Sequence, residues 1–310
     1  MRTQSKIRGY LLGALGAAAY GTNPLFAKPL YADGMNPVSV LFFRYLMAIP
    51  IVYIMLHVRG RDIRVENRKD FMPFVILGVV MAVSSLSLFM SYTYMPAGIA
   101  STILFIYPIM VAVIMALLFN EKTSFATILC IAASTVGIFL LYRSEDGTTL
   151  DLLGTILVII SAASYAIYIV GINKTALNRL PTLLTTFYIV AVCDICYLVY
   201  ALATGGIHTP GHWYSWLCIL ALAVFPTVIS FTCTTVAIQS VGSTPTAILG
   251  ALEPATAIII GMAVFDEEMT GRIATGLVLI ILSVMFVIGS GENSPNYLNR
   301  LKKMFPKVRR

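Results

Sequence analysis

Charged residues are scarce in this chain. Asp, Glu, Lys and Arg make up 11% of its 310 residues, whereas hydrophobic residues make up 58%. An ordinary soluble domain carries about a quarter charged residues, so this chain cannot cover a water-exposed surface. The charges that are present fall in short clusters between long apolar runs, and the mean hydropathy is +0.87. These features exclude a soluble globular protein and predict an all-α integral membrane protein.

Cysteine is also infrequent, and its placement excludes a disulfide framework. The cysteines are odd in number and all lie inside apolar stretches: Cys130, Cys193, Cys196, Cys218 and Cys233. We interpret them as free thiols, and the C-x-x-C pair among them as packing rather than a redox site, because no strand–helix unit adjoins it. The three histidines sit at loop edges without a third ligand nearby in sequence. We therefore expect no metal site and no cofactor.

Several motifs of enzymes and pumps are missing. The sequence contains no G-x-x-x-x-G-K-[ST] loop, no H-E-x-x-H pair and no G-x-S-x-G elbow, so ATP-driven transport and the familiar hydrolase chemistries lack support. The net charge of +7 does not indicate nucleic-acid binding, because Lys and Arg concentrate at the termini and in one loop. A membrane-embedded enzyme, a passive channel and a lipid scramblase remain as alternatives to a transporter.

What the sequence does have is a series of apolar stretches of the length that a bilayer requires, about 20 residues each. They lie near residues 9–30, 37–57, 71–94, 97–119, 124–142, 152–172, 182–203, 213–239, 243–265 and 270–290. These stretches predict ten transmembrane helices.

Lys and Arg are distributed unevenly over the two sides of such a bundle. If the N-terminus is cytoplasmic, nearly all loop Lys and Arg fall inside, and only Arg143 and Arg272 fall outside. The positive-inside rule then places both termini in the cytoplasm. The membrane that we expect is the plasma membrane of a bacterium or archaeon. The expected partners are the lipid bilayer and a small-molecule solute, and we expect a monomer or a weak homodimer.

The chain also repeats itself. The run from Tyr107-Pro108 to Glu121 aligns without a gap with the run from Glu253-Pro254 to Glu267, at an offset of 146 residues. This predicts one five-helix repeat at 1–146, a second at 147–292, and a basic cytoplasmic tail at 293–310. Because five is odd, the second repeat must enter the membrane upside down, which gives two inverted repeats around a central cavity.

These segments resemble a known family. The stretch Tyr94-Met-Pro-Ala-Gly-Ile-Ala-Ser101, the two proline-to-glutamate runs, Tyr20-Gly-Thr-Asn-Pro24 and Phe43-Arg44-Tyr45 are similar to the drug/metabolite transporter superfamily, and more narrowly to its EamA family. The likeness covers nearly the whole chain. It implies ten helices, two inverted halves around a cavity, and export of amino acids or related metabolites, but it does not fix the substrate.

Two prolines and one carboxylate mark the expected site. Pro108 and Pro254 occupy equivalent positions in the two halves, and paired interruptions of this kind point to a midplane site, although prolines also simply kink membrane helices. Glu253 lies midway along its span, where a carboxylate costs at least about 2.5 kcal/mol unless it is paired, protonated or hydrated. It could bind a proton, bind a substrate ammonium group, or form a helix–helix hydrogen bond that holds the scaffold.

Polar side chains at helical spacing are the remaining candidates for a solute pathway. They are Tyr20 and Asn23; Ser84, Ser87 and Ser91; Tyr107; Ser161, Ser164, Tyr165 and Tyr168; Thr227, Ser230 and Thr234. Any single hydroxyl in this set is as well explained by a bond to its own helix backbone. Arg44 lies about 10 Å below the surface and needs a carboxylate, carbonyl or anionic substrate partner. Lys28 can snorkel to the interface, and Asp194 has no assigned role.

The sequence therefore favours a secondary transporter that exports amino acids or similar small amphipathic metabolites by alternating access. Proton coupling is a hypothesis that rests on Glu253 alone.

Overall fold

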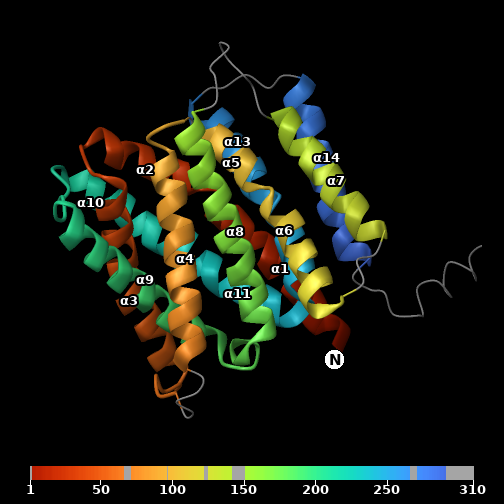
Figure 1. Cartoon of the computed structure of the whole chain (residues 1–310), viewed down its shortest axis with the longest axis horizontal. Helices are drawn as coiled ribbons and strands as arrows, with labels where there is room; N and C mark the ends of the chain where they lie inside the picture. Colours follow the sequence, from red (N-terminus) through yellow and green to blue (C-terminus); the bar gives the residue numbers. More distant parts are fainter. Residues whose placement is uncertain are drawn as a thin grey trace, which may run out of the picture.

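The structure is a computed structural model that describes residues 2–65, 71–95, 97–121, 125–141, 151–265 and 271–290. The expected basic tail at 293–310 lies outside these residues. Within the described ranges the chain is helical and contains no strand. Figure 1 shows the helices side by side in one bundle.

The ten expected spans match the observed helices. Three spans are broken in two, α1 (Arg2–Tyr20) with α2 (Asn23–Ala32), α5 (Ala97–Leu104) with α6 (Tyr107–Phe119), and α12 (Ser243–Leu249) with α13 (Leu252–Phe265). The other helices are α3 (Pro37–Val58), α4 (Phe71–Ser91), α7 (Phe125–Leu141), α8 (Leu152–Lys174), α9 (Thr182–Thr204) and α14 (Gly271–Ser290). The eighth span runs through α10 (Trp213–Ala223), a π-helical stretch η3 (Val224–Ile229) and α11 (Ser230–Val241), and a short η2 (Ala176–Asn178) follows α8.

Local sequence signals explain where these helices begin and end. Asn36 caps α3, since its Oδ1 accepts a hydrogen bond from the Ser39 amide at 2.8 Å, and proline occupies the first position of the helix. Asp151 caps α8 in the same way, through the Gly154 amide at 2.7 Å. Gly242 ends α11 at a φ of 94°, which glycine adopts without steric cost.

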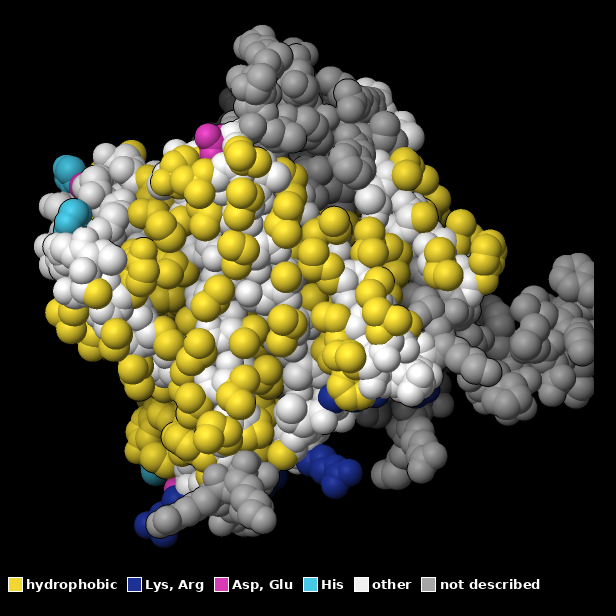
Figure 2. Space-filling view, in the orientation of Figure 1, with side chains coloured by type: hydrophobic (Ala, Val, Ile, Leu, Met, Phe, Trp, Pro, Cys, Tyr) yellow, Lys and Arg dark blue, Asp and Glu magenta, His cyan; other side chains and the backbone are white. Residues whose placement is uncertain are grey.

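Many large apolar side chains of this bundle point outward, as a lipid solvent requires. Leu117 is 74% exposed, Phe125 80% and Leu202 71%. In Figure 2 hydrophobic side chains cover the visible face, and the Lys and Arg side chains gather along its lower edge, where α1 begins. Among the residues that the structure describes, five continuous helical segments are long and apolar enough to cross a membrane: α3, α4, α8, α9 and Trp213–Val241, the last of which includes the π-helical stretch. We call the end at which α1 begins the basic end.

The main helix contacts between the two halves form a symmetric set. α4 packs on α8 and α1 packs on α11, while α3 with α9 and α7 with α14 pair equivalent helices of the two halves. α7 and α14 lie side by side at the right of Figure 1. Exchange of the two halves therefore leaves this set of helix pairs unchanged.

Candidate functional site

The three broken helices bring their interruptions together. The gaps fall at Gly21-Thr22, Phe105-Ile106 and Gly250-Ala251, and two of these gaps lie just before the prolines singled out from the repeat. A break inside a membrane span frees backbone groups that lipid cannot satisfy, so it persists where it faces protein or a wet cavity.

Two glycines allow the breaks to touch. A Cβ atom added at Gly250 would overlap the hydroxyl of Tyr107, and one added at Gly21 would overlap the backbone carbonyl oxygen of Glu253. The first contact joins the α12–α13 break to the start of α6, and the second joins the α1–α2 break to the start of α13. Glycine is required at both positions because any other side chain would push the helices apart.

A small cavity lies where these breaks meet, with room for roughly one water molecule. Its lining comes from both halves of the chain: Gly13, Ala17, Tyr20, Tyr107, Tyr165, Ile169, Ser230, Thr234, Thr246, Gly250 and Glu253. Glu253 is the one charged side chain in this lining. It stands in the first turn of α13 and is 8% exposed, and no described side chain donates a hydrogen bond to its carboxylate. A helix N-terminus is a favourable place for an anion.

Tyrosine rings form one wall of the cavity. The Tyr165 ring meets the Tyr107 ring edge-on at a centroid distance of 4.9 Å. The same ring stacks against Tyr20 at 6.3 Å and against Tyr168 at 6.1 Å. The face of Tyr165 and its neighbours is therefore held by ring contacts among α1, α6 and α8.

Arg44 anchors a second polar cluster next to this wall. Its side chain is fully buried, and it donates from Nε to Thr227 Oγ1 (2.5 Å), from Nη1 to Asn23 Oδ1 (2.8 Å) and from Nη2 to the Pro226 carbonyl (2.9 Å). The guanidinium carbon lies 6.0 Å from the centre of the Tyr20 ring. These bonds tie α3 to α2 and to the π-helical stretch. Asp194, which has no role assigned from the sequence, is not among these acceptors; it is 7% exposed on α9.

Other hydroxyls of the expected pathway hold helices together. Ser84 and Ser161 bond across α4 and α8, each hydroxyl donating to the carbonyl of the other residue, at 3.0 and 2.8 Å. Ser91 donates to the Leu88 carbonyl of its own helix at 2.7 Å. The structure thus groups one subset at the cavity, namely Tyr20, Tyr107, Tyr165, Ser230, Thr234 and Glu253. A second subset lies in the Arg44 cluster (Asn23, Arg44, Thr227), while Ser87, Ser164 and Tyr168 lie outside the lining.

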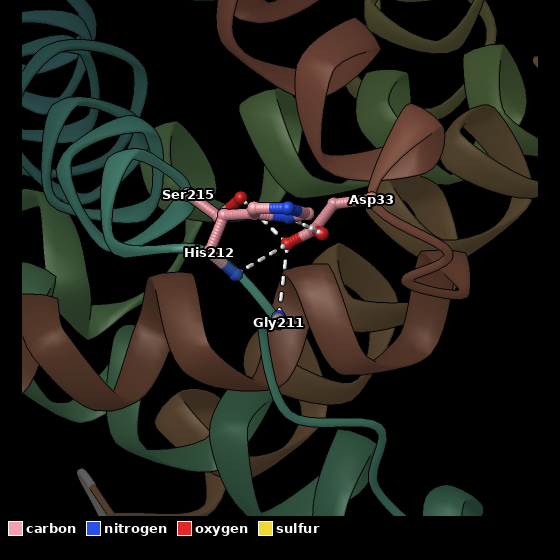
Figure 3. A network of polar contacts seen from close by, with 4 residues as sticks. All are labelled: Asp33, Gly211, His212 and Ser215. Carbon is pink, nitrogen blue, oxygen red and sulfur yellow. Dashed lines mark hydrogen bonds and ion pairs between the residues drawn. The ribbon is translucent and has the colours of Figure 1, made fainter.

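A carboxylate that the sequence patterns did not indicate lies at the end opposite to the basic end. Asp33, after α2, accepts hydrogen bonds on Oδ2 from the Gly211 amide (3.0 Å), the His212 amide (3.2 Å) and Ser215 Oγ (2.7 Å), and its Oδ1 meets His212 Nδ1 (Figure 3). Its side chain is 3% exposed. The hydrogen bond from Ser215, followed by that from His212, lowers the pKa of Asp33 to about 2. We call this cluster the Asp33 clamp.

Contacts between the two halves also occur at the basic end. Lys174 Nζ lies 3.6 Å from Glu121 Oε2 and 5.0 Å from the centre of the Phe119 ring, which joins the end of α8 to the end of α6. Cross-half contacts therefore exist at both ends of the bundle, with the cavity in the helix-break region between them.

Comparison with known proteins identifies the fold and the family. The EamA-like transporter family matches residues 7–143 and, a second time, residues 152–289. The chain belongs to the EamA-like transporter family. This membership confirms the resemblance seen in the sequence and the ten-helix membrane fold.

Relatives of this EamA-like chain carry transporter names. An uncharacterized transporter of Archaeoglobus fulgidus is 25% identical over 87% of this chain and 93% of its own length. A threonine/homoserine exporter, RhtA, of Salmonella typhimurium is 24% identical over 70% of this chain and 71% of its own length. A solved crystal structure that is 15% identical superposes with a TM-score of 0.78, over 90% of this chain and 97% of that one, which supports the fold alone.

Proposed function

We propose that this EamA-like chain is a secondary transporter that exports amino acids or similar small amphipathic metabolites by alternating access. The observation that carries the proposal is the meeting of broken helices from both halves at a single carboxylate, Glu253, inside an apolar bundle. Discontinuous helices that meet near the midplane are the arrangement in which secondary transporters hold their solutes.

The internal repeat would allow the two halves to move relative to each other. Five helices in each half, with helix pairs that are preserved when the halves are exchanged, support two inverted repeats, one at 1–146 and the other at 147–292. In such a bundle, rocking of one half against the other opens the central site to one side at a time. The basic end would face the cytoplasm, because its loops carry most of the Lys and Arg.

The two ends of the bundle provide the contacts that rocking would break in turn. The Asp33 clamp joins the first half to the second at one end, and Glu121 with Lys174 joins them at the basic end. The cavity has room for about one water, so it must widen before a solute enters. In the proposed cycle this arrangement would be the state in which both ends are closed over the site.

Glu253 is the residue on which proton coupling would depend. Its carboxylate is the one charge in the cavity lining, and it can hold either a proton or a cationic group of the solute. If a proton displaces the solute from Glu253, the flow of protons down their gradient drives solute in the opposite direction. Coupling is part of the proposal and is tested separately from transport itself.

Transport is tested with purified protein in proteoliposomes. Labelled amino acids, nucleosides and organic cations are offered singly, and uptake is measured against unlabelled solute trapped inside. We expect uptake of an amino-acid class that saturates and is stimulated by trapped solute. A carrier has one site that must return to the outside in each cycle, either empty or loaded with trapped solute. Flux that neither saturates nor responds to trapped solute would instead indicate a channel or a scramblase.

A further inference from the structure

The Asn23 side chain, at the first position of α2, is oriented by Arg44. Arg44 Nη1 donates to Asn23 Oδ1 at 2.8 Å, and this bond fixes which end of the amide is the oxygen. The Nδ2 group must therefore point elsewhere. It is buried without a hydrogen-bond partner, in a side chain that is 2% exposed. A buried amide donor left without an acceptor is costly, so an acceptor at this position would stabilise the site.

Arg44 itself has unused capacity. A guanidinium carries five N–H donors, and the three hydrogen bonds that Arg44 donates go to the neutral acceptors Thr227, Asn23 and the Pro226 carbonyl. No described carboxylate forms an ion pair with it, although the side chain is fully buried. A buried cation in a membrane span calls for an anion or for a dense set of acceptors. The cluster thus offers a positive charge and spare donors beside a break in the first span.

The Arg44–Asn23 cluster adjoins the Glu253 cavity through one ring. Tyr20 lines the cavity, and its ring centre lies 6.0 Å from the guanidinium carbon of Arg44. Asn23 follows Tyr20 by three residues, across the α1–α2 break at Gly21-Thr22. If Tyr20 rotates as the cavity widens, the basic Arg44–Asn23 cluster and the acidic Glu253 cavity would become one continuous site.

We propose that Asn23 and Arg44 form the carboxylate-binding half of the solute site, and that Glu253 binds the ammonium group. The substrate class is then the zwitterionic α-amino acid, whose two charges match one anionic partner, Glu253, which lines the cavity with Tyr20, and one cationic partner, Arg44, which lies beside the Tyr20 ring. Guanidinium and amide N–H groups suit the planar oxygens of a carboxylate. This inference rests on the proposed function, and it adds the requirement that the solute carries a carboxylate.

The decisive variant is Asn23→Asp. Aspartate has nearly the shape of asparagine and can still accept the bond from Arg44, so the cluster keeps its packing. It replaces the unpaired donor with a negative oxygen and neutralises Arg44, which fills the place proposed for the solute carboxylate. Asn173→Asp is the matched control, because Asn173 lies on α8 and its amide bonds Ser243 at 3.1 Å, outside the cavity lining.

The probes are leucine, threonine and phenylalanine, each compared with its carboxamide, which lacks the carboxylate, and its N-acetyl derivative, which lacks the ammonium group. Binding to purified protein is measured by calorimetry, and competition is measured in the uptake assay. In the wild type we expect at least one free amino acid to bind about tenfold or more tightly than both of its derivatives, because each derivative leaves a buried charged partner without its counter-group.

In Asn23→Asp the preference for the amino acid over its amide should fall to about one, through weaker binding of the amino acid and unchanged or tighter binding of the amide. Asn173→Asp should keep the wild-type ratio. Equal weakening of both ligands in Asn23→Asp would reveal a purely structural cluster and overturn the inference. So would a wild type that binds amide and amino acid alike, or binds neither.

The binding measurement separates this inference from the proposed function. Saturable transport of solutes without a carboxylate would leave the transporter proposal standing and remove the carboxylate site. Selective binding of amino acids without any flux would leave the carboxylate site standing and remove the transporter proposal.

Discussion

The hydroxyl of Tyr107 occupies the space that a side chain at Gly250 would fill. This relationship joins the start of α6 in the first half to the α12–α13 break in the second, and it sets the distance between the halves at the cavity. Its consequences can be measured directly.

Gly250→Ala should destabilise the protein by about 1–3 kcal/mol, because the added methyl group overlaps the Tyr107 hydroxyl and one helix must shift. The measurement is thermal unfolding in detergent. Gly271→Ala is the matched control, since a Cβ atom there meets nothing within 4 Å. Removal of the hydroxyl in Gly250→Ala/Tyr107→Phe should recover part of the loss. Similar melting temperatures for the two glycine variants would contradict the proposed contact.

Arg44→Lys should lower stability by about 2–4 kcal/mol, although the charge is kept. A lysine ammonium cannot reach Thr227, Asn23 and the Pro226 carbonyl with the fork geometry of a guanidinium, so buried acceptors lose their donors. Arg64→Lys provides the comparison, since Arg64 pairs with Asp62 on the surface and should change stability by less than about 0.5 kcal/mol. An Arg44→Lys protein as stable as Arg64→Lys would show that the buried bonds contribute little.

The Asp33 clamp should respond to acid in a defined range. The pKa of Asp33 in the folded protein, about 2, lies below its ordinary value of 3.8, so the clamp adds stability above about pH 4 and loses it as the pH falls toward 2. The protein contains two tryptophans, Trp213 and Trp216, and both lie next to the clamp at the start of α10. Their fluorescence should change between pH 4 and pH 2 in the wild type.

That change should be absent in Asp33→Asn, which lacks the titrating group, and present in Asp151→Asn, which alters another acidic helix cap. At pH 5 to 8 Asp33 stays ionised, so we expect no response from this carboxylate in that range. A pH 4 to 2 response that persists in Asp33→Asn would exclude the clamp as its source.

The Glu121–Lys174 pair should affect movement more than stability. The two side chains are 51% and 31% exposed, and surface pairs of this kind contribute about 0–1 kcal/mol. If it closes the basic end, Glu121→Gln should raise the rate at which a cysteine at Thr246 reacts with a maleimide added from that end. The charge-reversed double variant Glu121→Lys/Lys174→Glu should restore the slow rate. An unaltered rate in Glu121→Gln would remove this pair from the gate.

Much of this architecture could be predicted from the sequence. The lengths of the apolar stretches predicted the membrane spans, and the aligned prolines predicted the positions of two helix breaks. Both signals are local in the sequence. Helical spacing placed Ser230 and Thr234 on one face, and both line the cavity together with Glu253. Ser84 and Ser161 each belong to a polar stripe with the same helical spacing, but they bond each other between α4 and α8. The spacing alone could not distinguish these two cases.

The Asp33 clamp could not be predicted, since its partners are separated by nearly 180 residues and no repeat or spacing connects them. The role of Gly250 was hidden for a similar reason. Its requirement comes from the hydroxyl of a residue in the other half, not from its own turn. Two acceptors of the Arg44 hydrogen bonds, Thr227 and the Pro226 carbonyl, are also distant in sequence, and they belong to a π-helical stretch that sequence periodicity does not reveal.

The most direct test of the account is solute flux driven by a pH gradient in Glu253→Gln proteoliposomes, compared with wild type and with the surface variant Asp62→Asn. We predict that the wild type and Asp62→Asn concentrate the solute against its gradient when a pH gradient is imposed, and that Glu253→Gln does not, because glutamine cannot exchange a proton. Equal pH-driven accumulation in Glu253→Gln would contradict the proposal that this carboxylate couples proton movement to transport.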